Sequence, residues 1–300
     1  MNEPHEWQRS VLSLVMPDAV VRHLATSIVE RVEKEGFLVS YCRPLEVAPE
    51  RLDALFETQL RRTDEAYRFR LLDRLFAFGP VIGLVYEDVS DSPEPAHERL
   101  MRIKGATDPR DAAPGTLRRD FGGINAMLNL VHIADQPAQS ALEAELLFGP
   151  DEVAQDRPPR GSAEHGTDRE SALSLLRMLE TAPRESRSFD DVLAGHRACV
   201  LSACWTQLSA AARSAAAAAL DGGALSEIGI GARIADGLCG AEAHPAYYLL
   251  RADWQPGHQA LPERELLKAL AGLGLPRDRW AELVLLTSAC FAPIRWSGER

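Results

Sequence analysis

The chain has 300 residues, which is enough for two ordinary domains or one large one. Hydrophobic residues make up 46% and charged residues 26%, and this composition excludes a wholly disordered or collagen-like chain. The 33 basic residues are outnumbered by 44 acidic ones, and the resulting charge of −11 argues against a broad nucleic-acid-binding surface.

The cysteine pattern and the hydropathy of the sequence indicate in which cellular compartment the protein is expected. The five cysteines include no CxxC pair, so neither a disulfide framework nor a zinc site is expected. The longest apolar stretch, 210–220, is interrupted by Arg213 and is shorter than the roughly 20 residues of a membrane span. The first ten residues lack the apolar core of a signal peptide. We therefore expect a cytoplasmic protein with reduced thiols and no membrane partner.

The first half of the chain alternates between strand-like and helix-like patterns. Strands are expected at 11–15, 37–41, 80–86 and 128–133. Helices are expected at 21–32, 50–60, 64–76, 96–103 and 140–148. A long loop over 105–123 precedes the last strand. This order predicts an α+β fold, in which helices pack against one sheet.

The second half follows a segment rich in proline, glycine and charge. Its composition predicts a linker over 151–170, between a domain at 1–150 and a helical domain at 171–300. Helices are expected at 172–179, 191–220, 263–271 and 278–291. Residues 247–250 are compatible with a buried strand or with a helix turn.

The segment 105–135 is the best candidate for a functional site, since a long loop inside a compact domain is typical of function or of disorder. Thr107, Thr116, Arg118 and Arg119 can all contact anionic oxygens, and four glycines let the backbone approach a ligand. The segment then enters an apolar strand that carries His132. These residues are compatible with an anion site beside a nucleophilic histidine.

The chemistry expected of this site depends on His132 and its neighbours. A neutral imidazole held by an acid through one nitrogen can attack phosphorus with the other, and Glu143 on the following helix is the candidate acid. Asn129 lies three residues before His132, so a bulge or the strand's end is needed to bring the two side chains together. On spacing alone a structural histidine, ion-paired arginines and ordinary turn residues explain the same pattern.

The same residues resemble the nucleoside diphosphate kinase family. The similarity is carried by GATDPRD at 105–111, PGTLRRDF at 114–121 and NLVH at 129–132. Upstream it continues with LVMPD at 14–18, EGF at 35–37 and GPV at 79–81. The resemblance covers about residues 9–150, and it leaves the helical second half unrecognised.

The resemblance implies a ferredoxin-like antiparallel sheet and phosphoryl transfer in two half-reactions. A nucleoside triphosphate such as ATP would give its γ-phosphate to His132, and a nucleoside diphosphate would then take it. Mg²⁺ would bridge the phosphates, with no metal ligands assigned to the protein. Glu143 would orient the histidine, and Asn129 would contact the ribose and terminal phosphate region. Homo-oligomers are usual in the family, so one is expected here.

Nucleotide contacts carried over from the resemblance include both matches and departures. Thr107 and Arg118 would contact phosphates, and Phe69 would stack on the base. Met16 stands where the family has the lysine of its Lys-Pro-Asp turn.

Three further positions depart from the family pattern. The family's helix arginine falls on Met101, with Arg102 or Arg99 as the substitute after a register shift. Phe56 lacks the hydroxyl of a family tyrosine. Ala134 replaces the serine that supports the acid.

These departures leave alternatives open. The favoured hypothesis is an active, divergent phosphotransferase acting through His132. The others are a catalytically weakened nucleotide-binding or regulatory module, and a kinase for a non-nucleotide acceptor that uses residues 171–300.

Overall fold

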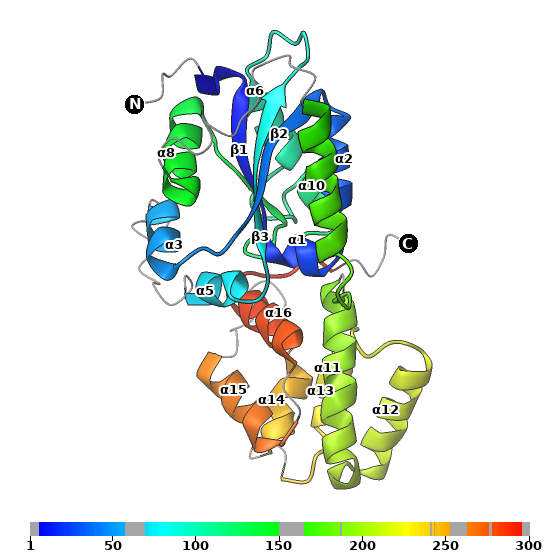
Figure 1. Cartoon of the computed structure of the whole chain (residues 1–300). Helices are drawn as coiled ribbons and strands as arrows, with labels where there is room; N and C mark the ends of the chain where they lie inside the picture. Colours follow the sequence, from blue (N-terminus) through cyan, green and yellow to red (C-terminus); the bar gives the residue numbers. More distant parts are fainter. Residues whose placement is uncertain are drawn as a thin grey trace. The chain divides into compact units, whose positions relative to one another are not determined.

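The chain divides into two compact units, as shown by the computed structural model (Figure 1), which describes residues 6–57, 70–149, 165–186, 188–240, 242, 244–252, 263–275 and 278–295. The first unit consists of Met1–Gly123 and Leu128–Glu185, and the second of Ile124–Met127 and Ser186–Arg300. Each is described separately below.

The first unit is built on a four-stranded antiparallel sheet. Its strands are β1 (Ser10–Val15), β2 (Phe37–Leu45), β3 (Val81–Asp88) and β4 (Val131–Ile133), in the order β2-β3-β1-β4. All residues of β1 and β3 are buried, because these central strands are covered on both faces. The sheet confirms the predicted ferredoxin-like α+β fold.

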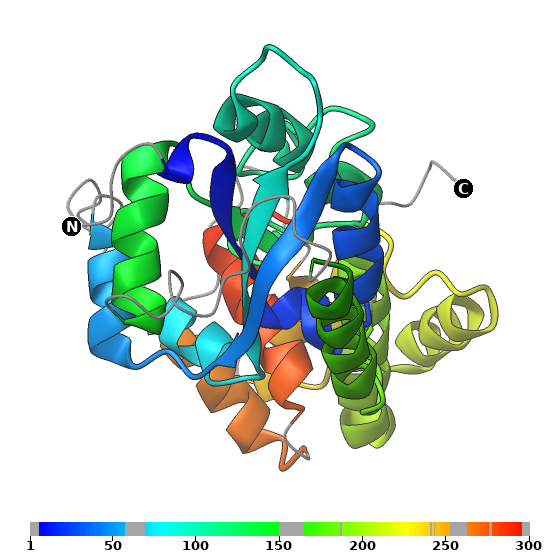
Figure 2. The same ribbon diagram turned by 45° about the horizontal axis from the view of Figure 1, so that its top comes forward.

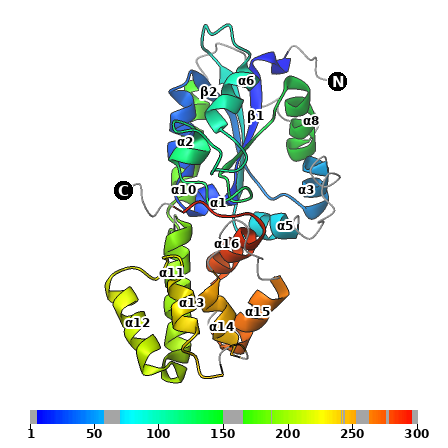
Figure 3. The same ribbon diagram turned by 180° about the vertical axis from the view of Figure 1, so that it is seen from behind.

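Helices cover both faces of this sheet. They are α1 (Pro17–Val21), α2 (Ala25–Glu33), α3 (Pro49–Leu55), α5 (Arg70–Phe76), α6 (Ala96–Lys104), α7 (Leu117–Asp120), α8 (Pro137–Phe148) and α10 (His165–Leu179), preceded by a 3₁₀ turn at Glu6–Gln8. In Figures 2 and 3, α8 lies on one side of the sheet, and α2 and α10 lie on the other.

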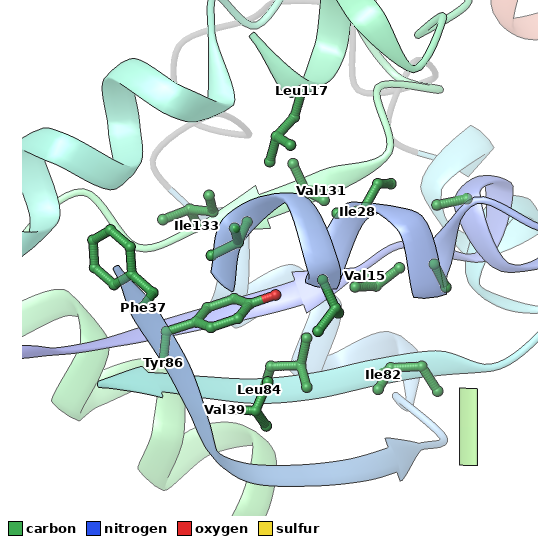
Figure 4. Packing of buried hydrophobic residues seen from close by; sticks show 14 of the residues in the cluster. Val15, Ile28, Phe37, Val39, Ile82, Leu84, Tyr86, Leu117, Val131 and Ile133 are labelled. Atoms are coloured by element: carbon green, nitrogen blue, oxygen red, sulfur yellow. The ribbon is translucent and has the colours of Figure 1, made fainter. Parts of the chain in front are cut away.

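Side-chain alternation assigns the residues of β4 to the two faces. Val131 and Ile133 join the buried cluster between the sheet and α2, together with Ile28 (Figure 4). His132, between them, therefore faces the layer that contains α8. It pairs across the sheet with Leu14 of β1.

Two predicted elements begin or break elsewhere in the structure. The single helix expected over 21–32 is divided into α1 and α2, because His23 adopts a left-handed φ of 54°. The strand expected over 128–133 begins only at Val131, after a turn at Leu130. Residues 58–69, within the helices expected at 50–60 and 64–76, lie outside the described part.

Helix α10 packs within the first unit and starts at His165, inside the range predicted as linker. Leu173 and Leu176 are fully or almost fully buried in the cluster of the sheet and α2. Arg169 forms a salt bridge of 2.9 Å with Glu33, and Glu180 accepts from the backbone and hydroxyl of Thr26 at 3.1 and 2.8 Å. These contacts extend the first unit beyond residue 150.

The second unit is helical, as predicted. Its helices are α11 (Phe189–Cys204), α12 (Ala210–Asp221), α13 (Ile230–Ala235), α14 (Pro245–Arg251), α15 (Glu263–Gly272) and α16 (Arg279–Cys290), with a 3₁₀ turn at Trp205–Gln207. The expectation of one helix over 191–220 is wrong, since Ser209 starts a new helix by accepting from Ala212 N at 3.2 Å. Residues 247–250 form a helix turn.

Two features hold the second unit together. The fully buried Arg197 donates to the carbonyls of Leu225 and Ala252 at 2.7 and 3.0 Å. The short segment Ile124–Met127 belongs to this unit, where the buried Asn125 donates to Thr287 of α16 at 3.0 Å. Among the described residues, no helix has the length and apolar character needed to cross a bilayer.

Candidate active site

A tight backbone turn precedes the histidine-bearing strand. Val131 N donates to Asn129 O at 2.9 Å around Leu130, whose φ is 78°. This is a γ-turn with a positive central φ, a strained form that must be held by its surroundings. Because Asn129 lies before this turn rather than within β4, the strand alternation that would separate it from His132 does not apply.

The turn is held by the segment that follows β1. Met16 N donates to Leu130 O at 2.9 Å, and Asp18 accepts from Leu130 N at 3.2 Å. Complete burial raises the pKa of Asp18 to about 6, although the nearby Arg22 opposes the shift. Met16 supports the turn through its main-chain N–H. Its side chain is buried and carries no charge.

His132 and Glu143 form a hydrogen-bonded pair between β4 and α8. His132 Nε2 lies 2.8 Å from Glu143 Oε2, and their side chains are 16% and 4% exposed. A carboxylate accepts the Nε2 hydrogen, which leaves Nδ1 as the unprotonated nitrogen. Within the described residues Nδ1 makes no hydrogen bond, so its lone pair is available to a ligand.

Phe56 borders the imidazole, at the C-terminal end of α3. Its ring meets that of His132 edge-on, with centroids 5.8 Å apart and planes at 69°. The structure thus brings Glu143 to His132, as the resemblance implied, and also places Phe56 beside the imidazole.

Two buried cations line the outer edge of β4. Arg118 donates to Asn129 O at 3.2 Å and to Val131 O at 2.8 Å, and Lys104 lies 3.4 Å from Ile133 O. The carbonyls of residues 129, 131 and 133 face away from β1 and have no neighbouring strand among the described residues. Each accepts a hydrogen bond from a cationic side chain instead. The guanidinium of Arg118, predicted to contact phosphate, is bound here to the main chain.

Burial also changes the protonation of these cations. The pKa of Lys104 falls to about 8, chiefly because the ammonium is buried and also because Arg118 repels it. The pKa of Arg118 falls to about 10 for the same first reason. Arg118 therefore stays charged near neutral pH, and so does most of Lys104.

The loop 105–116 is tied to the same edge. Asn129 donates from its side chain to Thr107 O at 3.1 Å, and Arg118 donates to Gly105 O at 3.3 Å. A side chain at Gly105 would meet Thr116 Oγ1 at 2.6 Å, and the φ of 85° also favours glycine there. The side chain of Thr107, within this loop, is exposed.

One other predicted residue lies apart from this geometry, and one lies outside the described residues. Arg102 is largely exposed on α6, where it pairs with Glu94 at 2.6 Å. Phe69, the predicted base-stacking residue, lies outside the described residues. Phosphate contact by Arg102 and Thr107 and stacking by Phe69 remain predictions.

The structure adds two residues that the sequence analysis missed. Gln139 donates to Glu143 at 2.6 Å; the signal for this contact was the four-residue spacing on one helix face. Lys104 occupies a buried helix position next to Ile103, and a lysine inside an apolar pattern was the available signal.

A model of the family described as nucleoside diphosphate kinase matches residues 9–153. The nucleoside diphosphate kinase of Pyrococcus horikoshii is 34% identical over 144 residues, which cover 47% of this chain and 86% of that protein. That of Moorella thermoacetica is 32% identical over 47% of this chain and 94% of its own length. The chain belongs to the nucleoside diphosphate kinase family.

Solved structures of this family also match the chain. A nucleoside diphosphate kinase family protein from Babesia bovis is 24% identical, with a TM-score of 0.43 over 53% of this chain and 99% of that one. The Aquifex aeolicus nucleoside diphosphate kinase is 27% identical, with a TM-score of 0.40 over 46% of this chain and 93% of that one.

Membership of the family supports nucleotide binding and phosphoryl transfer at family level. Within the described ranges, no group of three or more His, Cys, Asp or Glu side chains is arranged to hold a metal ion.

Proposed function

We propose that this protein transfers the terminal phosphoryl group of a nucleoside triphosphate to a nucleoside diphosphate through a phosphohistidine at His132. The observation that carries the proposal is the orientation of the imidazole: Nε2 is held by Glu143 at 2.8 Å, and Nδ1 has no partner among the described residues. Membership of the nucleoside diphosphate kinase family supports the same reaction.

The first half-reaction forms one bond and breaks another. The Nδ1 lone pair of His132 attacks the γ-phosphorus, and the bond to the β–γ bridging oxygen breaks, so the diphosphate leaves with that electron pair. The imidazole becomes positively charged, and the Glu143 carboxylate stabilises this charge through Nε2–H. In the second half-reaction a diphosphate oxygen attacks the phosphorus, and the bond to Nδ1 breaks.

The proposed nucleotide site uses the residues around this pair. Thr107, Arg118 and Arg102 would contact phosphates, and Phe69 would stack on the base. Arg118 would have to share its guanidinium between phosphate and the carbonyls of Asn129 and Val131, which it binds at 3.2 and 2.8 Å.

ATP is the proposed donor. Mg²⁺, carried by the nucleotide phosphates themselves, would supply neutralisation of their negative charge. The intact His132–Glu143 pair favours this activity over a weakened binding module.

We also propose the wider setting that the family resemblance implies. Copies of the chain would assemble into a homo-oligomer in the cytoplasm, with nucleotides as partners and without nucleic acid. The second unit, Ser186–Arg300 with Ile124–Met127, would have a separate role. Light scattering on the purified full chain tests the assembly.

Labelling with γ-³²P-ATP tests the reaction itself. The full chain should acquire acid-labile, base-stable label, which a nucleoside diphosphate should remove, and His132→Ala should acquire none. His244→Ala, in the second unit, is the matched control and should label like the wild type. Absence of label on the wild type, or label retained by His132→Ala, would overturn the proposal.

A further inference from the structure

Gln139 connects the acid of the pair to the backbone that follows β4. Its Nε2 donates to Glu143 Oε1 at 2.6 Å, and its Oε1 accepts from Asp135 N at 3.0 Å. The other oxygen of Glu143 is the one that holds His132. The four groups form a continuous chain that ends at the imidazole.

The direction of the Gln139 amide follows from its partners. A backbone N–H can only donate, so the amide oxygen must face Asp135, and the NH₂ group must then face Glu143. Gln139 and Glu143 are four residues apart on α8, a spacing that places them on one helix face. Both ends of the amide are thereby fixed.

The contact matters because the Glu143 side chain is only 4% exposed. Water cannot replace a donor to a buried carboxylate oxygen at small cost. A hydrogen bond donated to the charged form of an acid favours that form. Without the Gln139 donor, the His132–Glu143 pair would bind a proton more readily.

We propose that Gln139 is a positioning residue that keeps Glu143 ionised and turned toward Nε2 of His132, so that Nδ1 remains unprotonated. Its effect on phosphoryl transfer rests on the proposed function; its effect on the protonation of the pair does not. The supporting donor, which the sequence analysis found missing at Ala134, comes from the helix of the acid.

Two substitutions and one control test this role in the full chain. Gln139→Met keeps the length of the side chain without its donor, and Gln139→Glu places a second carboxylate beside the first. Gln136→Ala is the control, because Gln136 is exposed and its side chain makes no capping hydrogen bond. Melting curves verify that each variant is folded.

The first measurement is ¹⁵N-histidine NMR of His132 against pH, without nucleotide. In Gln139→Met the midpoint should move to higher pH by about one unit, and further in Gln139→Glu, because each change makes the pair bind its proton more tightly. A midpoint equal to that of the wild type in both variants would overturn the proposal. A purely structural role would lower the melting temperature and leave the midpoint unmoved.

The second measurement is the pH profile of label incorporation from γ-³²P-ATP. The acid side should move to higher pH in both variants, so that at pH values below the wild-type midpoint Gln139→Met should be labelled about 10-fold more slowly, equivalent to about 1.4 kcal/mol. Unchanged profiles in labelled variants would contradict the inference. If the wild type takes no label, the proposed function fails, and the NMR titration still decides the role of Gln139.

Discussion

Replacing Lys104 by methionine should stabilise the first unit near neutral pH. Lys104 is 6% exposed, and its ammonium makes only long contacts, a hydrogen bond to Ile133 O at 3.4 Å and a salt bridge to Asp135 Oδ1 at 3.6 Å. Methionine has similar length and packs well in irregular apolar surroundings. The variant removes a buried charge that the fold only partly compensates.

The magnitude follows from the change in pKa from 10.5 to about 8. Because the folded pKa is below the unfolded one, the unfolded state binds more protons between these values, and wild-type stability rises with pH across that window. Each unit of pKa difference corresponds to 1.36 kcal/mol, so below pH 8 the buried charge of Lys104 lowers the free energy of unfolding by ~3 kcal/mol. At pH 9.5 only ~1.4 kcal/mol of it remains.

Urea unfolding of Lys104→Met and wild type at pH 7 and pH 9.5 measures both values. The variant should be more stable by ~3 kcal/mol at pH 7, and the difference should be about halved at pH 9.5. Lys34→Met, at an exposed position, is the matched control and should show no such narrowing. A less stable Lys104→Met at pH 7, or a difference equal at both pH values, would refute the reasoning.

Two further substitutions test packing in each unit. Gly231→Ala places a Cβ 1.8 Å from Leu250 O and 2.6 Å from Arg197, so the free energy of unfolding of the second unit should fall by about 3 kcal/mol or more. Gly195→Ala is the control, because no atom lies within 4 Å of its Cβ, and it should be neutral or stabilising. Equal urea midpoints for the two variants would contradict close helix contact at Gly231. Leu176→Ala should destabilise the first unit by about 2–5 kcal/mol because Leu176 is fully buried. Met178→Ala is the control, because Met178 is 60% exposed, and it should leave the free energy of unfolding nearly unchanged. A small loss of stability in Leu176→Ala would show that α10 is not part of that unit's core.

Local patterns of the sequence were sufficient for most of the first unit. Alternating or continuous apolar runs located the four strands, and the motifs at 105–111, 114–121 and 129–132 identified the family. Local propensity was less informative where a single residue interrupts a periodic pattern. His23 divides one expected helix, and Ser209 begins a new helix within another.

The sequence pattern does not show which partner a predicted site residue binds when several acceptors compete for it. An arginine can bind phosphate or main-chain carbonyls, and Arg118 binds two carbonyls, Asn129 O at 3.2 Å and Val131 O at 2.8 Å. The side chain therefore satisfies buried acceptors that have no strand partner. The residue type was predictable, and its partner was not.

The sequence by itself determined the sheet and the family, because these follow from periodicity and from motifs local to the chain, and it offered Glu143 as the candidate partner of His132. Only the tertiary structure decided that α10 completes the first unit, through pairs such as Arg169 with Glu33 that are 136 residues apart. It also decided that Gln139 supports Glu143. Such contacts depend on how buried polar groups find partners after the elements have packed, and that geometry is not encoded in any single stretch of residues.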